Sequence, residues 1–261
     1  MEIIGFILSI LIGISLGLIG SGGSILTIPI LVYVFHVSPS DSTTYSLFVV
    51  GVSALAGSIN GAKHKLLDYK TALYFGLPSV ISVFLMRKLI VPLLPTELLT
   101  ISNFTLTTDL LIMLVFSVLM ILASFSMIQK RKMTENESSE INHNNLIFKG
   151  VFVGLLTGFV GGGGGFLIIP ALLFTAKLPM KKAVATSLII IVFNSLIGFL
   201  GSITSTKIEW NFLLLFTAFA VIGIFIGMFL SKKITNEKLK PLFGWFVLLT
   251  GIYIIIKEVI I

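Results

Sequence analysis

Long apolar stretches that carry almost no charge constrain this chain more than any other feature of its sequence. The stretch 212–230 contains no charged residue, 106–128 contains only Asp109, and 1–19 contains only Glu2. A helix needs about 20 consecutive, mostly apolar residues to cross the hydrocarbon core of a bilayer. Several stretches meet this requirement, so the sequence predicts an all-α integral membrane protein.

Composition excludes several classes of protein. Charged residues make up 11% of the chain, whereas soluble domains typically carry about 25%. Cysteine is absent and the three histidines do not cluster, so we expect no metal site and no cofactor. The sequence also has no nucleotide motif and no pair of buried carboxylates, which argues against ATP use and against an enzyme.

The chain repeats itself at an offset of 141 residues. The segment 17–31 reads GLIGSGGSILTIPIL, and the segment 158–172 reads GFVGGGGGFLIIPAL. Leu and Ile matches mean little in so apolar a chain, but Gly, Pro and Ser in register mean much more. We therefore predict two related halves, residues 1–129 and residues 147–261, joined by a polar linker at 130–146.

Each half divides into five apolar segments. Those of the first half are predicted at 3–19, 24–36, 43–61, 71–91 and 105–129. Those of the second half are predicted at 147–161, 164–176, 183–203, 211–231 and 241–257. The stretch 1–19 lacks the basic start of a signal peptide, so we expect it to be a retained helix.

Basic residues in the loops predict how the halves face. The Lys-rich loop 62–70 corresponds, through the repeat, to the Lys-poor loop 204–210, and the poor loop 37–42 corresponds to the rich loop 177–182. Basic loops stay in the cytoplasm, so the two halves should be inverted, with both termini outside and the linker cytoplasmic. The net charge of +7 then reflects topology, and we expect the lipid bilayer, not nucleic acid, as the partner.

The Gly runs are the candidate substrate site. The segments 24–36 and 164–176 are too short to span the bilayer and each follows a Gly run, so each run should form a turn inside the membrane. Free N–H groups at the start of the following helix favour anions, while close helix packing is the competing interpretation. The candidate residues are Gly20, Ser21, Gly22, Gly23, Ser24, Gly161, Gly162, Gly163, Gly164 and Gly165.

Other polar residues lie inside apolar segments. The third segments carry Ser46, Ser187, Asn60 and Asn194, which either tie helices together or face the substrate pathway. Arg87 and Lys88 lie where few cations are expected, so they either snorkel to headgroups or face an anion pathway. Asp109 is interpreted as a residue of the membrane interface.

The paired patterns at 17–24 with Pro29 and at 158–165 with Pro170 resemble those of the sulfite exporter TauE/SafE family of permeases. The resemblance covers nearly the whole chain and implies transport of sulfite, sulfonates or other small organosulfur anions across the cytoplasmic membrane. It supplies a class and the motif positions only. Ser21 stands where the second half has Gly162, so the two turns differ chemically.

The sequence therefore predicts a secondary transporter that moves a small anion by alternating access where the two repeats meet. The alternative is a scaffold or accessory subunit of a larger membrane complex. A cation transporter is disfavoured because no buried acid is evident to receive the ion. Substrate identity, direction, energy coupling and oligomeric state do not follow from the sequence.

Overall fold

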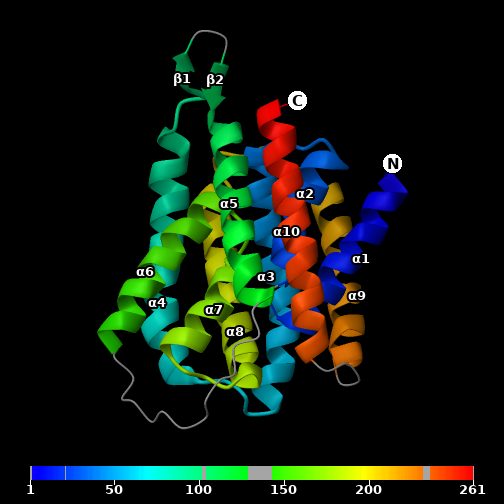
Figure 1. The fold of residues 1–261 in the computed structure, drawn as a ribbon, viewed down its shortest axis with the longest axis vertical. Coiled ribbons are helices and arrows are strands. Elements are labelled where there is room, and N and C mark those ends of the chain that lie inside the picture. The colour runs from blue at the N-terminus through cyan, green and yellow to red at the C-terminus, as the bar shows by residue number, and fades with distance from the viewer. Residues whose placement is uncertain (1, 21, 102–103, 129–142, 232–235, 261) are drawn as a thin grey trace.

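A computed structural model describes residues 2–20, 22–101, 104–128, 143–231 and 236–260. The described residues form a bundle of α-helices with one small β-hairpin (Figure 1). The helices of the first half are α1 (Glu2–Ile19), α2 (Gly22–Tyr33), α3 (Pro39–Lys63), α4 (Tyr69–Leu85) and α5 (Thr108–Ile128). Those of the second half are α6 (His143–Val160), α7 (Gly165–Thr175), α8 (Met180–Ser202), α9 (Trp210–Ser231) and α10 (Asn236–Ile260).

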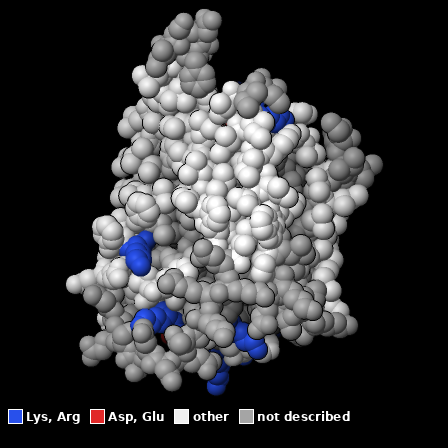
Figure 2. Space-filling model, viewed as in Figure 1, with Lys and Arg blue, Asp and Glu red and all other residues white. Residues whose placement is uncertain are grey.

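Five helical stretches in the described residues are long and apolar enough to cross a membrane. They are Pro39–Lys63, Tyr69–Leu93, Thr108–Phe125, Lys181–Ser202 and Trp210–Ser231. Shorter apolar helices cover Gly5–Ile19, Gly23–Tyr33 and Gly165–Thr175, beside the two Gly turns. On the face in Figure 2, a broad surface without Lys, Arg, Asp or Glu lies above a lower part where most visible Lys and Arg gather. The fold is that of an all-α membrane protein.

Every predicted apolar segment contains a helix, although α3, α6, α8 and α10 begin three to five residues before the predicted starts. Helix α6 begins at His143, before the expected start at 147. The fourth segment is not one regular helix, because α4 continues into the π-helical turn η1 (Met86–Ile90) and the 3₁₀ turn η2 (Val91–Leu93). The expected loop after it contains β1 (Glu97–Ile101), which pairs antiparallel with β2 (Phe104–Thr107). Figure 1 places this hairpin at the same end of the bundle as both termini.

The first helix of each half packs along the fourth helix of the other half. Helix α1 packs along α9, and helix α6 packs along α4. A Cβ added at Gly13 would lie 1.9 Å from Ala220 O, and one added at Gly154 would lie 2.4 Å from Ser79 O. These two contacts correspond at the repeat offset of 141 residues, as expected for two halves related by a two-fold axis. The direction of each half across the membrane stays a prediction.

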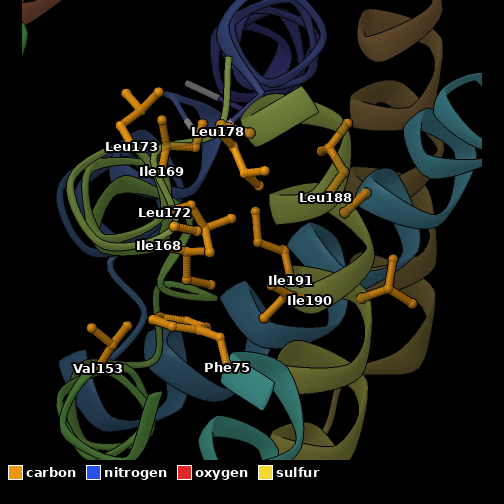
Figure 3. Packing of buried hydrophobic residues seen from close by; sticks show 14 of the residues in the cluster. Phe75, Val153, Ile168, Ile169, Leu172, Leu173, Leu178, Leu188, Ile190 and Ile191 are labelled. Atoms are coloured by element: carbon orange, nitrogen blue, oxygen red, sulfur yellow. The ribbon is translucent and has the colours of Figure 1, made fainter. Parts of the chain in front are cut away.

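The largest apolar cluster lies where α7 packs against α8 and the middle of the bundle. Figure 3 shows Ile168 and Leu172 of α7 facing Ile190 and Ile191 of α8, with Phe75 of α4 nearby. All five side chains are buried. Since lipid is as apolar as these side chains, close packing rather than expulsion from water holds them. This packing fixes the position of α7, which begins at the second Gly turn.

Candidate functional site

The first Gly turn joins α1 to α2. Gly20 has φ +81°, a left-handed conformation that glycine adopts without steric cost, and its N–H donates to Leu16 O at 2.8 Å. A Cβ added at Gly20 would lie 2.4 Å from Val184 Cγ1, and one added at Gly23 would lie 2.3 Å from Ile12 O. The turn therefore needs glycine both for its backbone and for its neighbours.

The second Gly turn joins α6 to α7 and has the more unusual backbone. Gly161, Gly163 and Gly164 have φ values of +81°, +64° and +68°. Gly164 is the N-cap of α7, where no side chain accepts a hydrogen bond from the helix start. The first N–H groups of a helix have no partner inside the helix. Gly165 and the residue after it therefore present donors at the positive end of α7.

Both short helices end well within a bilayer thickness. Helix α2 has 12 residues and α7 has 11, which gives lengths of roughly 16 to 18 Å at 1.5 Å per residue. The hydrocarbon core is about 30 Å thick. Each helix contains a proline away from its first turn, Pro29 in α2 and Pro170 in α7. These lengths favour turns that lie within the membrane thickness.

The two turns, from different halves, meet inside the protein. A Cβ added at Gly162 would lie 3.5 Å from Ser24 O, 3.6 Å from Phe166 and 3.7 Å from Phe116. These are ordinary van der Waals distances, and Ser24 is fully buried. Gly162 has no positive φ. The described structure therefore has room for a small side chain at Gly162.

The polar residues predicted in the third segments have different surroundings. Ser46, Ser187 and Asn194 are fully buried. Ser187 Oγ donates to Val184 O of its own helix at 2.8 Å, while Ser46 Oγ has no partner. Asn194 Nδ2 donates to Ser79 Oγ at 2.8 Å, but Asn194 Oδ1 accepts nothing. Ser21, the side chain of Asn60 and the surroundings of Gly22 lie outside the described part of the chain.

Buried polar atoms without a partner gather around the second turn. Ser195 Oγ lies 2.7 Å from the Cβ that Gly163 lacks, and Thr157 Oγ1 lies 2.0 Å from the Cβ that Gly164 lacks. Neither hydroxyl has a hydrogen-bond partner, and both residues are buried. Each unsatisfied buried group costs about 1–3 kcal/mol. The hydroxyl of Thr157 was missed from the sequence, because it looks like any other small residue in an apolar helix.

The adjacent cations Arg87 and Lys88 differ in burial. Arg87 is 1% exposed. Lys88 is exposed, with its Nζ 5.3 Å from the centroid of the Phe84 ring. Asp109 accepts hydrogen bonds from Ser40 N and Ser40 Oγ, near the start of α3. Of the two cations, only Arg87 is buried in the protein.

Comparison with known proteins agrees with this architecture. The sequence model described as "Sulfite exporter TauE/SafE" matches residues 5–254. The chain belongs to the sulfite exporter TauE/SafE family. The match includes both Gly turns and all but the ends of the first and last helices, so the TauE/SafE resemblance seen in the motifs is confirmed. The chain is thus a multi-pass membrane protein of a permease family.

Curated relatives of this TauE/SafE protein are named as transporters. A probable membrane transporter protein of Xylella fastidiosa is 29% identical over 252 residues, covering 94% of this chain and 91% of the relative. One of Bacillus subtilis is 24% identical over 279 residues, covering 97% and 98%. One of Methanocaldococcus jannaschii is 27% identical over 248 residues, covering 92% and 86%. No solved structure matches the chain significantly.

Proposed function

We propose that this chain moves a small anion across the cytoplasmic membrane, by alternating access at the interface of its two halves. The observation that carries the proposal is the meeting of the two Gly turns at Gly162 and Ser24, in the protein interior. Each turn precedes a short helix, α2 or α7. The helix starts bring positive partial charge and N–H donors to one place, which suits an anion.

Neighbouring hydroxyls support an anion over a cation. Ser195 and Thr157 lie against the second turn, and the hydroxyl of each is free to donate. No Asp or Glu is among the nearest neighbours of Gly161, Gly162, Gly163 or Gly164 in the described residues. A transported cation usually requires buried carboxylates or clustered carbonyls. These hydroxyls and the N–H groups at the start of α7 can all donate to an anion.

The tight packing of the turns supports alternating access. The atoms around Gly162 are already at van der Waals distances from an added methyl group, so a multi-atom anion fits between the turns only when the halves move apart. Helices α3 and α8 of opposite halves also pack against each other there. Rocking one half against the other would open the site to one side at a time. The described conformation then corresponds to a closed state.

Sulfite, a sulfonate or another organosulfur anion is the proposed substrate class. The support is the family name together with the close approach of the two turns at Gly162 and Ser24. Dipoles and hydroxyls distinguish anions mainly by size and shape, so the class is defined by a compact oxyanion. The orientation proposed with it places both termini outside the cell and the linker 130–146 in the cytoplasm, following the basic loops.

Transport by purified protein in liposomes tests the proposal. Wild-type protein should move sulfite or methanesulfonate, and Gly162→Leu should abolish this movement while the protein remains folded. A packing control is Gly251→Ala on α10, where an added Cβ would lie 3.1 Å from Ile121 of α5. It should lower the melting temperature without changing the substrate concentration at half-maximal flux.

Two results would contradict the proposed function. Full flux by folded Gly162→Leu would show that the substrate does not pass between the turns. No flux of any tested anion by the wild-type chain, together with copurification of a partner in fixed ratio, would instead support the alternative of an accessory subunit.

A further inference from the structure

Arg87 is the largest fully buried side chain among the described residues. It lies in the π-helical turn η1, immediately after α4. A π-helical turn holds an extra residue, and such turns are frequent at functional sites. The following residue, Lys88, is exposed. The chain therefore directs one of two adjacent cations into the protein.

The charge of Arg87 has only uncharged partners. Nη1 donates to Thr43 Oγ1 at 2.8 Å, Nη2 donates to Phe159 O at 3.4 Å, and Nε has no partner. Guanidinium has five N–H donors, so most of them are unused. No carboxylate in the described part of the chain bonds to it. Asp109 reaches it only indirectly, since Ser40 bonds Asp109 and the Ser40 carbonyl accepts from Thr43.

A structural role explains only part of this arrangement. Phe159 lies in the last turn of α6, and a cation near a helix C-terminus is favoured. That interaction is weak compared with the cost of burying an unpaired charge. If Arg87 served packing alone, an Arg paired with an acid, or an apolar residue, would cost less at this position. The remaining charge is therefore available for an anion.

Arg87 also lies against the second Gly turn. A Cβ added at Gly161 would lie 2.4 Å from Arg87 Nη2 and 2.3 Å from Thr43 Cβ. Glycine at this position is what lets the guanidinium reach the turn. The partnerless hydroxyls of Ser195 and Thr157 lie against Gly163 and Gly164 of the same turn. One full charge, two hydroxyls and the start of α7 thus converge there.

The first turn has no equivalent charge. At the repeat offset of 141 residues, Met228 corresponds to Arg87 and Val184 corresponds to Thr43. Gly20 packs against Val184 in the way that Gly161 packs against Thr43. The two turns share the positive φ of Gly20 and Gly161 but differ in the charge that lies against that glycine. Of these two matched glycines, only Gly161 has a charged side chain among its nearest neighbours.

We propose that Arg87 binds the charged end of the transported anion at the second turn, and that the site prefers a singly charged oxyanion over a doubly charged one. This inference rests on the proposed anion transport. One guanidinium neutralises one negative charge, and its planar fork suits two oxygens of a sulfonate or carboxylate. A dianion would retain an unpaired charge in a low-dielectric interior.

The test uses full-length protein, with methanesulfonate as the monoanion and sulfate as the dianion. Binding is measured as the rise in melting temperature against chloride at equal ionic strength, and transport is measured in liposomes. The variants are Arg87→Met, which copies the residue at 228, and Arg87→Lys. Lys88→Met is the control, because it removes the same charge from the adjacent exposed position.

Wild type and Lys88→Met should bind methanesulfonate alike and more tightly than sulfate. Arg87→Met should bind methanesulfonate about 10- to 100-fold more weakly, as expected for loss of a hydrogen bond to a charged group. Arg87→Lys should be intermediate because it keeps the charge and loses the fork. Without added anion, the melting temperature of Arg87→Met should not fall, since an unpaired buried charge is removed.

Three results would overturn the inference. Unchanged affinity of Arg87→Met for methanesulfonate would do so. If its melting temperature also fell, Arg87 would instead stabilise the C-terminal end of α6. Equal or tighter binding of sulfate would refute the preference for one charge. If Arg87→Met does not fold, unchanged affinity of Arg87→Lys overturns the role. If wild type binds and moves no anion, the proposed function fails and the role of Arg87 falls with it.

Discussion

Asn194 Nδ2 of α8 donates a 2.8 Å hydrogen bond to Ser79 Oγ of α4, between the two halves and inside the protein. The sequence left two roles open for this amide, tying helices together or facing the pathway. Its nitrogen ties two helices, while its oxygen has no partner. The Asn194 side chain therefore bonds across the two halves through Nδ2, while its Oδ1 has no hydrogen-bond partner.

Replacing Ser79 should destabilise the contact between the halves. Ser79→Ala leaves the buried Asn194 amide without an acceptor, so we expect a loss of about 1–3 kcal/mol, measured as a fall in melting temperature in detergent. The control is Ser82→Ala on the same helix, because Ser82 Oγ donates only to the helix carbonyl of Pro78. Equal effects of the two variants would show that the bond to Asn194 contributes nothing.

Glycines between α1 and α9 should tolerate no side chain. A Cβ at Gly223 would lie 2.1 Å from Ile10 O, and a backbone atom cannot move aside by changing rotamer. Gly223→Ala should therefore cost about 1–3 kcal/mol by overpacking. At Gly76 the nearest atom is the side chain of Ile190 at 3.2 Å, so Gly76→Ala should cost much less. Melting temperatures of the two variants check this order, and the reverse order would contradict the described packing.

Alanine substitutions at Gly164 and Gly162 of the second turn should have different effects on stability. Gly164→Ala forces φ +68° on an alanine and places its Cβ 2.0 Å from Thr157 Oγ1. Backbone strain alone costs about 1–2 kcal/mol, and the clash adds to it. Gly162→Ala meets neither obstacle and should melt close to wild type. Adding Thr157→Ala to Gly164→Ala should relieve the clash but not the backbone strain, so stability should return only in part. Complete recovery of the melting temperature would exclude a strained backbone.

Inversion of the halves can be measured directly because the chain has no cysteine. Lys63 and Thr204 correspond at the repeat offset, and both are exposed. A thiol reagent that does not cross membranes should label Thr204→Cys in intact cells. It should label Lys63→Cys only after the membrane is opened. Labelling of both positions from the same side would refute an inverted repeat.

The helices could be predicted because their signal is local. An apolar run such as 212–230 requires a spanning helix wherever it occurs, and α9 covers it. The β-hairpin and the π-helical turn were missed because neither changes the hydropathy of the sequence. Boundaries also differed where polar residues continue a helix, as at His143 of α6. Such residues carry no apolar signal, although their backbone remains helical.

The site was predicted only in part, for a related reason. Gly and Pro are unusual enough at 17–31 and 158–172 to mark both turns from the sequence alone. That Gly162 meets Ser24 depends on how α2 and α7 pack, and no local pattern encodes that contact. The hydroxyls of Ser195 and Thr157 acquire meaning only because the fold leaves them without partners beside the second turn.

The sequence by itself determined the membrane class, the duplication and the positions of the turns, since hydropathy and glycine are properties of the residues themselves. Only the tertiary structure decided that Arg87 is buried while Lys88 is exposed. The reason is physical: the partners of Arg87 are Thr43 and Phe159, which lie 44 and 72 residues away along the chain. A charge takes its role from the groups around it, and folding alone brings those groups together.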